Sequence, residues 1–330
     1  MILLSKYLNI GSKLDDRKVF DPILDLDSNY FININRIKNT KTKEFKNSYK
    51  KINNYFSDIA ILLKHSKRRG DIFYKKAVQR FNFPEISGIG LGYSKGKKGS
   101  GFGDALRNKI IDDAKEIIDV GRIDPEIFHL IGLFEENVGP DRLSDMFATL
   151  LKDEIEEYTK RICFELGINK DSYPNCKFEG KFLVNPYRKN KVLLLPQDLV
   201  HELPIANDWD DIERVCEEID KIKSEVNALI EHNWSKIKDS RKKQYIKDSI
   251  TNDKTILDKL INEYRESNVD EYDFLKDNLG EIALARYIQN FDEGNFKDNN
   301  KFESTLEVAL EVCERFKQQI ENQRGYKLLY

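Results

Sequence analysis

Apolar residues at helical spacing recur along most of this chain, and strand-like patterns are confined to its centre. In 45–63, for example, apolar side chains lie three and four residues apart, which is the spacing of one helix face. Similar spacing occurs in four further segments, at 106–118, 146–166, 254–264 and 303–320. Only 177–184 and 191–195 have the composition of strands, and the turn-rich 185–190 between them predicts a β-hairpin packed on a long helix. We therefore expect an α+β fold that is predominantly helical.

Composition divides the chain into three regions, and its 330 residues exceed what one compact core usually holds. Residues 1–85 are basic and mainly helical, 86–205 form a central α+β region with a glycine-rich loop, and 206–330 form an acidic helical bundle. In the last region, apolar residues from Ile212 to Leu229 alternate in steps of three and four, as in a coiled coil. This seam is shorter than three heptads. A helical hairpin within the chain and a seam between subunits both remain open.

The charge of the chain is distributed unevenly, although its formal net charge is only −2. Residues 1–110 carry 23 Lys and Arg against 10 Asp and Glu, whereas 111–330 carry 32 against 47. A near-neutral total therefore does not exclude an anionic partner, because one third of the chain is strongly basic.

Basic and aromatic residues lie together in the first region. Two basic clusters flank the helix expected at 45–63, and the second contains Lys67, Arg68 and Arg69. A cation that neutralises a phosphate releases counterions, so a basic surface with aromatic residues favours nucleic-acid binding. An ordinary solvated helix face would explain either cluster alone. Because the whole segment is basic, we predict that these three residues bind nucleic acid.

A glycine-rich stretch follows, in which seven of the chain's 17 glycines lie between Gly88 and Gly103. Lys95, Lys97 and Lys98 lie among these glycines, and a helical pattern begins directly afterwards. Glycines, lysines and a helix N-terminus are the ingredients of a phosphate-binding loop. The spacing matches neither the Walker A nor the dinucleotide-binding pattern. Contact between the three lysines and a nucleic-acid backbone remains open beside a plain flexible loop.

Several function classes are disfavoured by what the sequence lacks. Its four cysteines show no CxxC spacing, which predicts free thiols in a reducing cytoplasm. No apolar run is long enough to cross a bilayer, so we expect a cytoplasmic protein that does not bind membranes. The four histidines form no HExxH or HNH-like pattern, and no Gly-x-Ser-x-Gly is present. His129, beside apolar residues, is expected to be a half-buried core residue.

The central region concentrates carboxylates. Four of them lie within eleven residues: Glu135, Glu136, Asp141 and Asp145. A long helix is expected to begin with Ser144 as its N-cap and to end at Gly167. Downstream, Glu179 and Lys181 lie two apart on a predicted strand, so both side chains should point to one face. Carboxylates from separate elements hold the metal ions that hydrolyse phosphodiesters, and a lysine can orient the attacking water.

Pro140-Asp141 followed by Glu179-Gly180-Lys181 resembles the signature of the PD-(D/E)xK nuclease superfamily. The resemblance implies a mixed sheet flanked by helices, bound Mg²⁺ (or Mn²⁺) and cleavage of DNA. It assigns catalytic roles to four residues: Asp141, Asp145, Glu179 and Lys181. It assigns metal ligation to three: Glu136, Asp141 and Glu179. The block 132–146 also resembles bacterial proteins from phage-defence loci.

Structural roles would account for the same residues. Asp141 follows Gly139-Pro140 as a turn residue would, and Asp145 would face the positive end of the helix dipole. Glu179 and Lys181 would then lie on a solvent-facing hairpin. Two functions remain open: a magnesium-dependent nuclease acting in phage defence, and a non-catalytic adaptor. The adaptor would bind nucleic acid with its basic part, and a protein partner or a second copy with its acidic helices.

Overall fold

The computed structural model describes eight stretches of the chain: residues 2–28, 30–91, 103–121, 123–133, 135, 138, 140–202 and 242–266. Several predictions lie outside these stretches: Glu136, Lys95, Lys97, Lys98, the seam at 212–229 and the helix at 303–320. The backbone of Asp141 is described within a helix, but its side chain is not.

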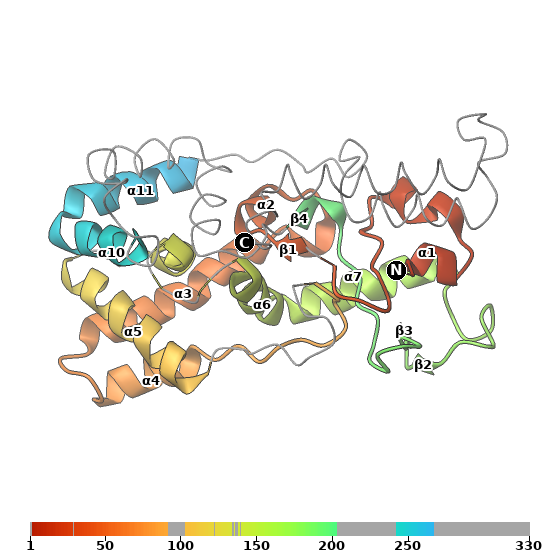
Figure 1. Ribbon diagram of the computed structural model, residues 1–330, viewed down its shortest axis with the longest axis horizontal. Coiled ribbons are helices and arrows are strands. Elements are labelled where there is room, and N and C mark those ends of the chain that lie inside the picture. Colours follow the sequence, from red (N-terminus) through yellow and green to blue (C-terminus); the bar gives the residue numbers. More distant parts are fainter. Residues whose placement is uncertain are drawn as a thin grey trace, which may run out of the picture.

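Helices make up most of the described chain, which confirms the predominantly helical fold (Figure 1). The α-helices are α1 (Leu4–Tyr7), α2 (Ile34–Asn39), α3 (Ser48–His65), α4 (Ile72–Arg80), α5 (Asp104–Asp119), α6 (Pro140–Leu150), α7 (Lys152–Glu165), α10 (Lys242–Asn252) and α11 (Lys254–Glu266). Short 3₁₀ turns connect them: η1 (Gly11–Lys13), η2 (Asp15–Arg17), η3 (Lys43–Phe45), η4 (Pro125–Phe128), η5 (Ile131–Leu133) and η6 (Gln197–Leu199). None of the helices described is long and apolar enough to cross a membrane.

Two small antiparallel sheets of two strands each complete the described fold. β1 (Tyr30–Ile32) pairs with β4 (Val200–Glu202), which brings together two segments about 170 residues apart in the sequence. β2 (Phe178–Glu179) pairs with β3 (Phe182–Leu183) in a tight hairpin. The mixed sheet implied by the nuclease resemblance is not found among the residues described here.

The predicted hairpin is confirmed in part: residues 185–190 bring Val184 and Lys191 into an antiparallel bridge, and the N–H of Val192 donates to the carbonyl of Leu183 at 2.8 Å. Its first strand, however, is interrupted. β2 and β3 both lie within the stretch expected to be a single strand, and Gly180 and Lys181 form the turn between them. Gly180 has φ +60, a left-handed conformation that glycine adopts without steric cost, so the chain reverses there. The expectation that Glu179 and Lys181 share one face of a strand is therefore wrong.

The long helix expected from Ser144 is two helices. α6 begins at Pro140, as is common for proline, whose missing N–H costs nothing in a first turn. Leu151, with φ −103 and ψ 13, separates α6 from α7. Ser144 therefore lies inside α6 and is not an N-cap.

The end of the second helix is as predicted. Gly167 has φ +66, and its N–H donates to the carbonyl of Phe164 at 3.2 Å. The N–H of Ile168 donates to the carbonyl of Cys163 at 2.8 Å. This pair of bonds is the Schellman motif, in which glycine satisfies the last carbonyls of a helix.

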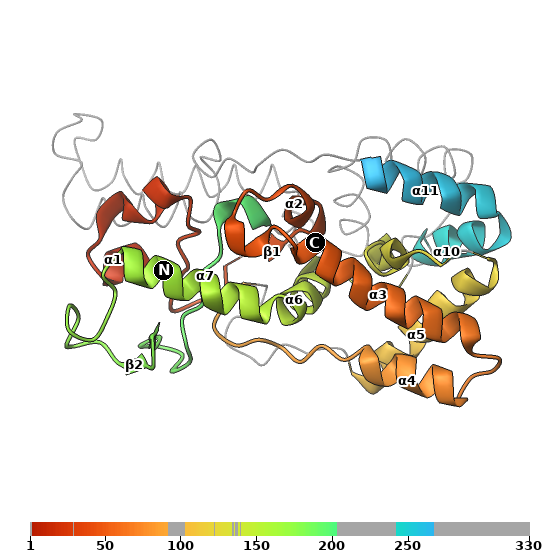
Figure 2. The same cartoon turned by 180° about the vertical axis from the view of Figure 1, so that it is seen from behind.

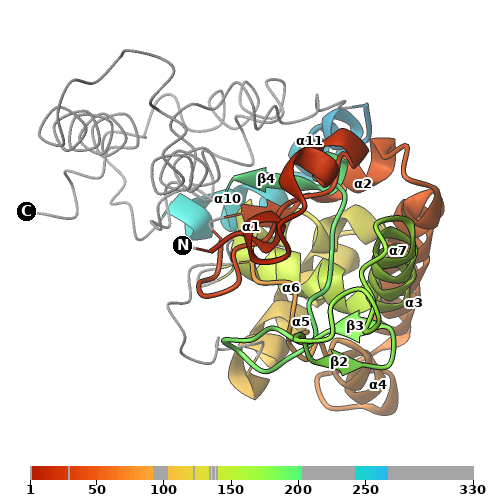
Figure 3. The ribbon, with the colours of Figure 1, turned by 90° about the vertical axis from the view of Figure 1, so that its right-hand side faces the viewer.

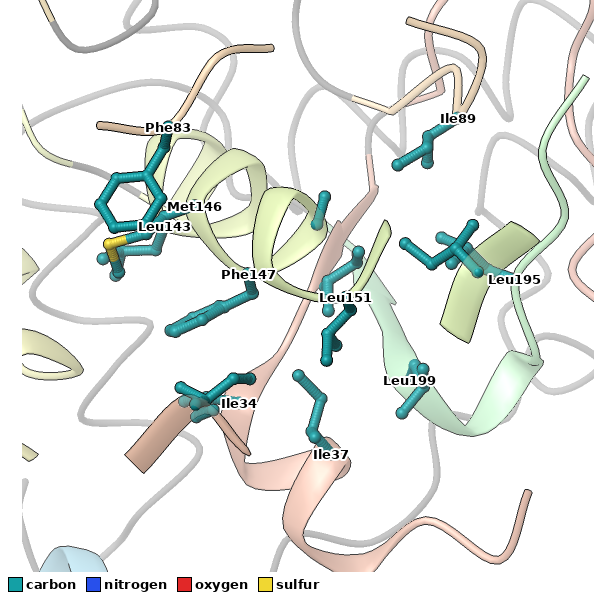
Figure 4. Packing of buried hydrophobic residues seen from close by; sticks show 14 of the residues in the cluster. Ile34, Ile37, Phe83, Ile89, Leu143, Met146, Phe147, Leu151, Leu195 and Leu199 are labelled. Carbon is teal, nitrogen blue, oxygen red and sulfur yellow. The ribbon is translucent and has the colours of Figure 1, made fainter. Parts of the chain in front are cut away.

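Helix α6 lies in the middle of the apolar core. Figure 4 shows its side chains surrounded by residues from α2, from the segment after α4 and from the segment that leads into β4. The labelled residues are Ile34, Ile37, Phe83, Ile89, Leu143, Met146, Phe147, Leu151, Leu195 and Leu199. Burying a large apolar side chain contributes about 1.5–3 kcal/mol, so this cluster holds segments distant in sequence around one helix.

A second part of the core joins α3, α4 and α5 at one end of the molecule (Figures 1 and 2). The rings of Phe56 and Phe128 are stacked with centroids 5.0 Å apart, and Phe81 meets Phe83 edge-on at 4.9 Å. In Figure 3, which views the molecule along its longest axis, α7 lies in front of α3, and Lys51 of α3 pairs with Glu154 of α7 at 2.8 Å.

The described cysteines are free thiols, as predicted. Cys163 is buried in α7 and Cys176 is half-buried. Burial raises the pKa of the Cys163 thiol to about 11, so this thiol stays protonated and unreactive at neutral pH.

Candidate nucleic-acid interface

The turn between α3 and α4 is fixed by one carboxylate. Asp71, the N-cap of α4, accepts a hydrogen bond from the N–H of Tyr74 at 2.8 Å. It also accepts bonds from the N–H groups of Lys67 at 2.7 Å and Arg68 at 3.3 Å. These bonds lower the pKa of Asp71 to about 2, so it stays ionised at neutral pH. With Gly70 at φ +81 completing the reversal, the backbone carrying the two cations is held in one conformation.

The cations at this turn differ in their partners. Arg69 pairs with Asp112 of α5 at 3.0 Å, and Asp112 also accepts a bond from the hydroxyl of Tyr74 at 2.6 Å. Arg69 therefore ties the turn to α5. Five other cations are exposed and form no ion pair with any described residue: Lys64, Lys67, Arg68, Lys75 and Lys76.

Two large apolar side chains are exposed among these cations. Ile72 is 64% exposed and Phe73 is 41% exposed, although both lie in the first turn of α4. The ring of Phe73 lies 6.0 Å from that of His65, between ring centroids. Exposed apolar side chains rimmed by charges are typical of interaction sites. We name this set the α3–α4 surface: Lys64, Lys67, Arg68, Ile72, Phe73, Lys75 and Lys76.

Nothing in the sequence indicated that Ile72 and Phe73 would be exposed. The buried face of α4 is formed by Tyr74 and Ala77, and it continues into Phe81. A helix of nine residues makes only about two and a half turns, so its apolar spacing does not reveal from sequence alone which face is buried.

Glu135, from the predicted carboxylate cluster, is fully buried. Its Oε1 lies 2.6 Å from Nζ of Lys109 on α5. Burial, together with the neighbouring carboxyl of Asp113, raises the pKa of Glu135 to about 8 despite this lysine. Glu135 therefore holds a proton at neutral pH.

Two lysines of α10 lie close to Glu135 and Asp113. Lys247 forms ion pairs with Asp113 and, at 3.1 Å, with Glu116. Nζ of the buried Lys243 donates to the carbonyl of Val138 at 3.0 Å. These ion pairs and hydrogen bonds fasten α10 to α5 and to the segment that precedes α6.

The predicted catalytic residues lie in different parts of the fold. Asp145 is half-buried in α6, whereas Glu179 is exposed on β2 with its Oε1 3.4 Å from Nζ of Lys191. Figures 1 and 2 show α6 at one end of α7 and the β2–β3 hairpin near the other. Lys181, exposed in the hairpin turn, lines a pocket beside the C-terminal part of α7.

The described side chains do not assemble a metal site. No group of three His, Cys, Asp or Glu among them is arranged to hold an ion. Glu136 and the side chain of Asp141 are not part of that set. The magnesium ligands Glu136, Asp141 and Glu179, and the catalytic roles of Asp145 and Lys181, therefore stay predictions.

The fold and the surface define a predominantly helical α+β protein with an exposed basic turn. A protein family described as a domain of unknown function (DUF8370) matches residues 9–207. This match covers more than half of the chain, so the chain belongs to that family. The matched range contains the α3–α4 surface, α6 and the β2–β3 hairpin. No curated protein and no solved structure matches the chain.

Proposed function

We propose that this protein binds nucleic acid through the α3–α4 surface. The supporting observation is a set of five exposed cations that pair with none of the described carboxylates and surround two exposed apolar side chains. Each such cation can neutralise a phosphate and release counterions, which is the main source of sequence-independent affinity. The exposed ring of Phe73 adds a face for contact with a base or a sugar. The excess of basic residues in 1–110 is consistent with this assignment.

A magnesium-dependent nuclease acting on DNA in phage defence is the finer proposal. It is supported by the resemblance of Asp141, Glu179 and Lys181 to a nuclease signature. The alternative is a non-catalytic adaptor that also binds a protein partner or a second copy through its C-terminal helices. The Glu179–Lys191 ion pair favours the adaptor, because it gives the predicted metal ligand a structural partner.

Fluorescence anisotropy with a labelled DNA duplex tests the binding proposal. The test variant replaces Lys67, Arg68, Lys75 and Lys76 with alanine, and all four side chains are exposed, so the fold should persist. We expect its affinity to fall by about tenfold or more at moderate salt, since four phosphate contacts are removed.

A matched control variant removes the same charge elsewhere. It replaces four other exposed lysines with alanine: Lys13, Lys46, Lys152 and Lys177. We expect the control to bind nearly as tightly as the wild type. Equal losses in both variants would mean that net charge, and not the α3–α4 surface, sets the affinity.

A further inference from the structure

A pocket of about 1030 Å³ lies beside the C-terminal part of α7, on a different part of the molecule from the α3–α4 surface. Its walls come from η3, α7, the segment 168–171 and the β2–β3 hairpin. The hairpin is packed against α7 there, with Nζ of Lys160 lying 5.7 Å from the ring centroid of Phe182. The turn residues Gly180 and Lys181 thereby form part of the rim.

Ion pairs join several of the residues that line this pocket. Nε of Arg161 lies 2.6 Å from Oε1 of Glu44, and its second bond to Glu44 is 3.1 Å long. Arg161 also binds Glu165 at 2.8 Å, and Lys160 binds Glu157 at 2.9 Å. These cations are neutralised, so they shape the pocket more than they attract a ligand.

The rim of the pocket carries cations that are not neutralised in this way. Lys170 and Lys181 are exposed and form no ion pair with the residues that the structure describes. Nζ of Lys43 lies 4.0 Å from Oε1 of Glu44, which is a long distance for an ion pair, and Arg161 already binds Glu44. The lining as a whole holds five cations and three carboxylates. An anionic ligand therefore complements it.

One aromatic ring projects into solvent beside these lysines. Phe164 is 87% exposed, more than any other large apolar residue in the described chain. It lies on the last turn of α7, and Phe178 of the hairpin lies in the same lining. An exposed ring beside free cations is the arrangement on which the bases of a single strand stack, while the cations contact phosphates.

The geometry points to a binding site for single-stranded nucleic acid in this pocket, with one base stacked on Phe164 and the flanking phosphates at Lys170 and Lys181. This inference rests on the proposed function and adds a substrate class to it. In a duplex the bases are already stacked and paired, so Phe164 cannot reach a base face. The pocket therefore favours single strands, whereas the α3–α4 surface contacts the backbone of either form.

Substitution of Phe164 tests this inference with the full-length protein. Because the side chain is so exposed, Phe164→Ala should fold normally, and a thermal melt checks this. Binding of a short single strand and of a duplex of the same sequence is measured by anisotropy. We expect Phe164→Ala to weaken single-strand binding by about tenfold and duplex binding by less than about twofold. Ile61→Ala, an exposed apolar residue on α3, is the matched control and should change neither.

A second readout locates the contact directly. A single strand carrying 5-iodouracil is cross-linked by ultraviolet light, and the modified peptides are identified by mass spectrometry. We expect cross-links at Phe164 or Phe178, and their loss in Lys170→Ala/Lys181→Ala.

The outcomes separate the two proposals. If the wild type binds neither oligonucleotide, the proposed function fails and this inference fails with it. If the wild type binds both but Phe164→Ala binds the single strand as tightly and no cross-link falls near the pocket, only the inference is overturned.

Discussion

The hydroxyl of Ser144 in α6 accepts a buried hydrogen bond of 2.9 Å from the backbone N–H of Ile32 in β1. Ser144 lies near the C-terminal end of the block 132–146. This hydrogen bond joins α6 to the β1–β4 sheet, so Ser144 has a structural role.

Ser144→Ala leaves the N–H of Ile32 buried without its acceptor. We expect the free energy of unfolding to fall by about 1–3 kcal/mol, the cost of an unsatisfied buried polar group. Denaturant titration measures it. Ser172→Ala, at an exposed serine, should change the stability by less than about 0.5 kcal/mol. Equal effects of the two substitutions would show that the bond to Ile32 does not matter.

The buried carboxyl of Glu135 should make the protein less stable as pH rises. Its pKa is about 8 in the folded chain against an ordinary 4.5, so between these values the folded state keeps a proton that the unfolded state releases. The free energy of unfolding should therefore fall as pH rises through this window. Glu135→Gln should reduce the decline and stabilise the protein above pH 8. Denaturation curves across the window measure it, with exposed Glu85→Gln as control. An unchanged decline in Glu135→Gln would contradict this.

His129 should make the protein less stable at acidic pH. It is buried among the rings of Tyr49, Phe56 and Phe147, and burial lowers its pKa to about 4 from 6.5. Below pH 6.5 the imidazole is protonated in the unfolded state but stays neutral in the folded state. The free energy of unfolding therefore falls as pH falls from 6.5 to 4. His129→Phe should reduce this loss in denaturation curves over the same range. Exposed His65→Phe is the control, and equal acid sensitivity of both variants would contradict the assignment.

The nuclease proposal is tested by incubating the protein with supercoiled plasmid and Mg²⁺ or Mn²⁺. If Glu179 holds metal and Lys181 serves the attacking water, Glu179→Ala and Lys181→Ala should abolish cleavage. Both side chains are exposed, so neither substitution should unfold the protein. A wild type that leaves the plasmid intact, or variants that cut as fast, would leave the adaptor as the function to pursue.

Local patterns in the sequence predicted several of the helices, although they missed the break at Leu151 between α6 and α7. The apolar spacing of 45–63 corresponds to α3, and that of 254–264 to α11, because an amphipathic helix repeats its signal over several turns. The stop at Gly167 was also predictable, since a glycine after the last apolar position commonly ends a helix.

Features that depend on distant partners were not predictable. β1 pairs with β4 from the far end of the matched domain, and no local pattern specifies that pairing. The turn at Gly180 was missed although a glycine inside a strand pattern is a warning of irregularity. The basic turn at Lys67 and Arg68 was recognised by charge alone. The exposure of Phe164 needed the packing of α7 to be known.

The most direct test of the central claim is the salt dependence of duplex binding. Each phosphate contact contributes about 0.9 to the slope of log K against log salt concentration. Alanine at Lys67, Arg68, Lys75 and Lys76 should therefore reduce the magnitude of the slope by roughly 3–4 relative to wild type. The control variant at Lys13, Lys46, Lys152 and Lys177 should keep the wild-type slope. An unchanged slope in the α3–α4 variant, or no salt-dependent binding by the wild type, would contradict the assignment of this surface to nucleic acid.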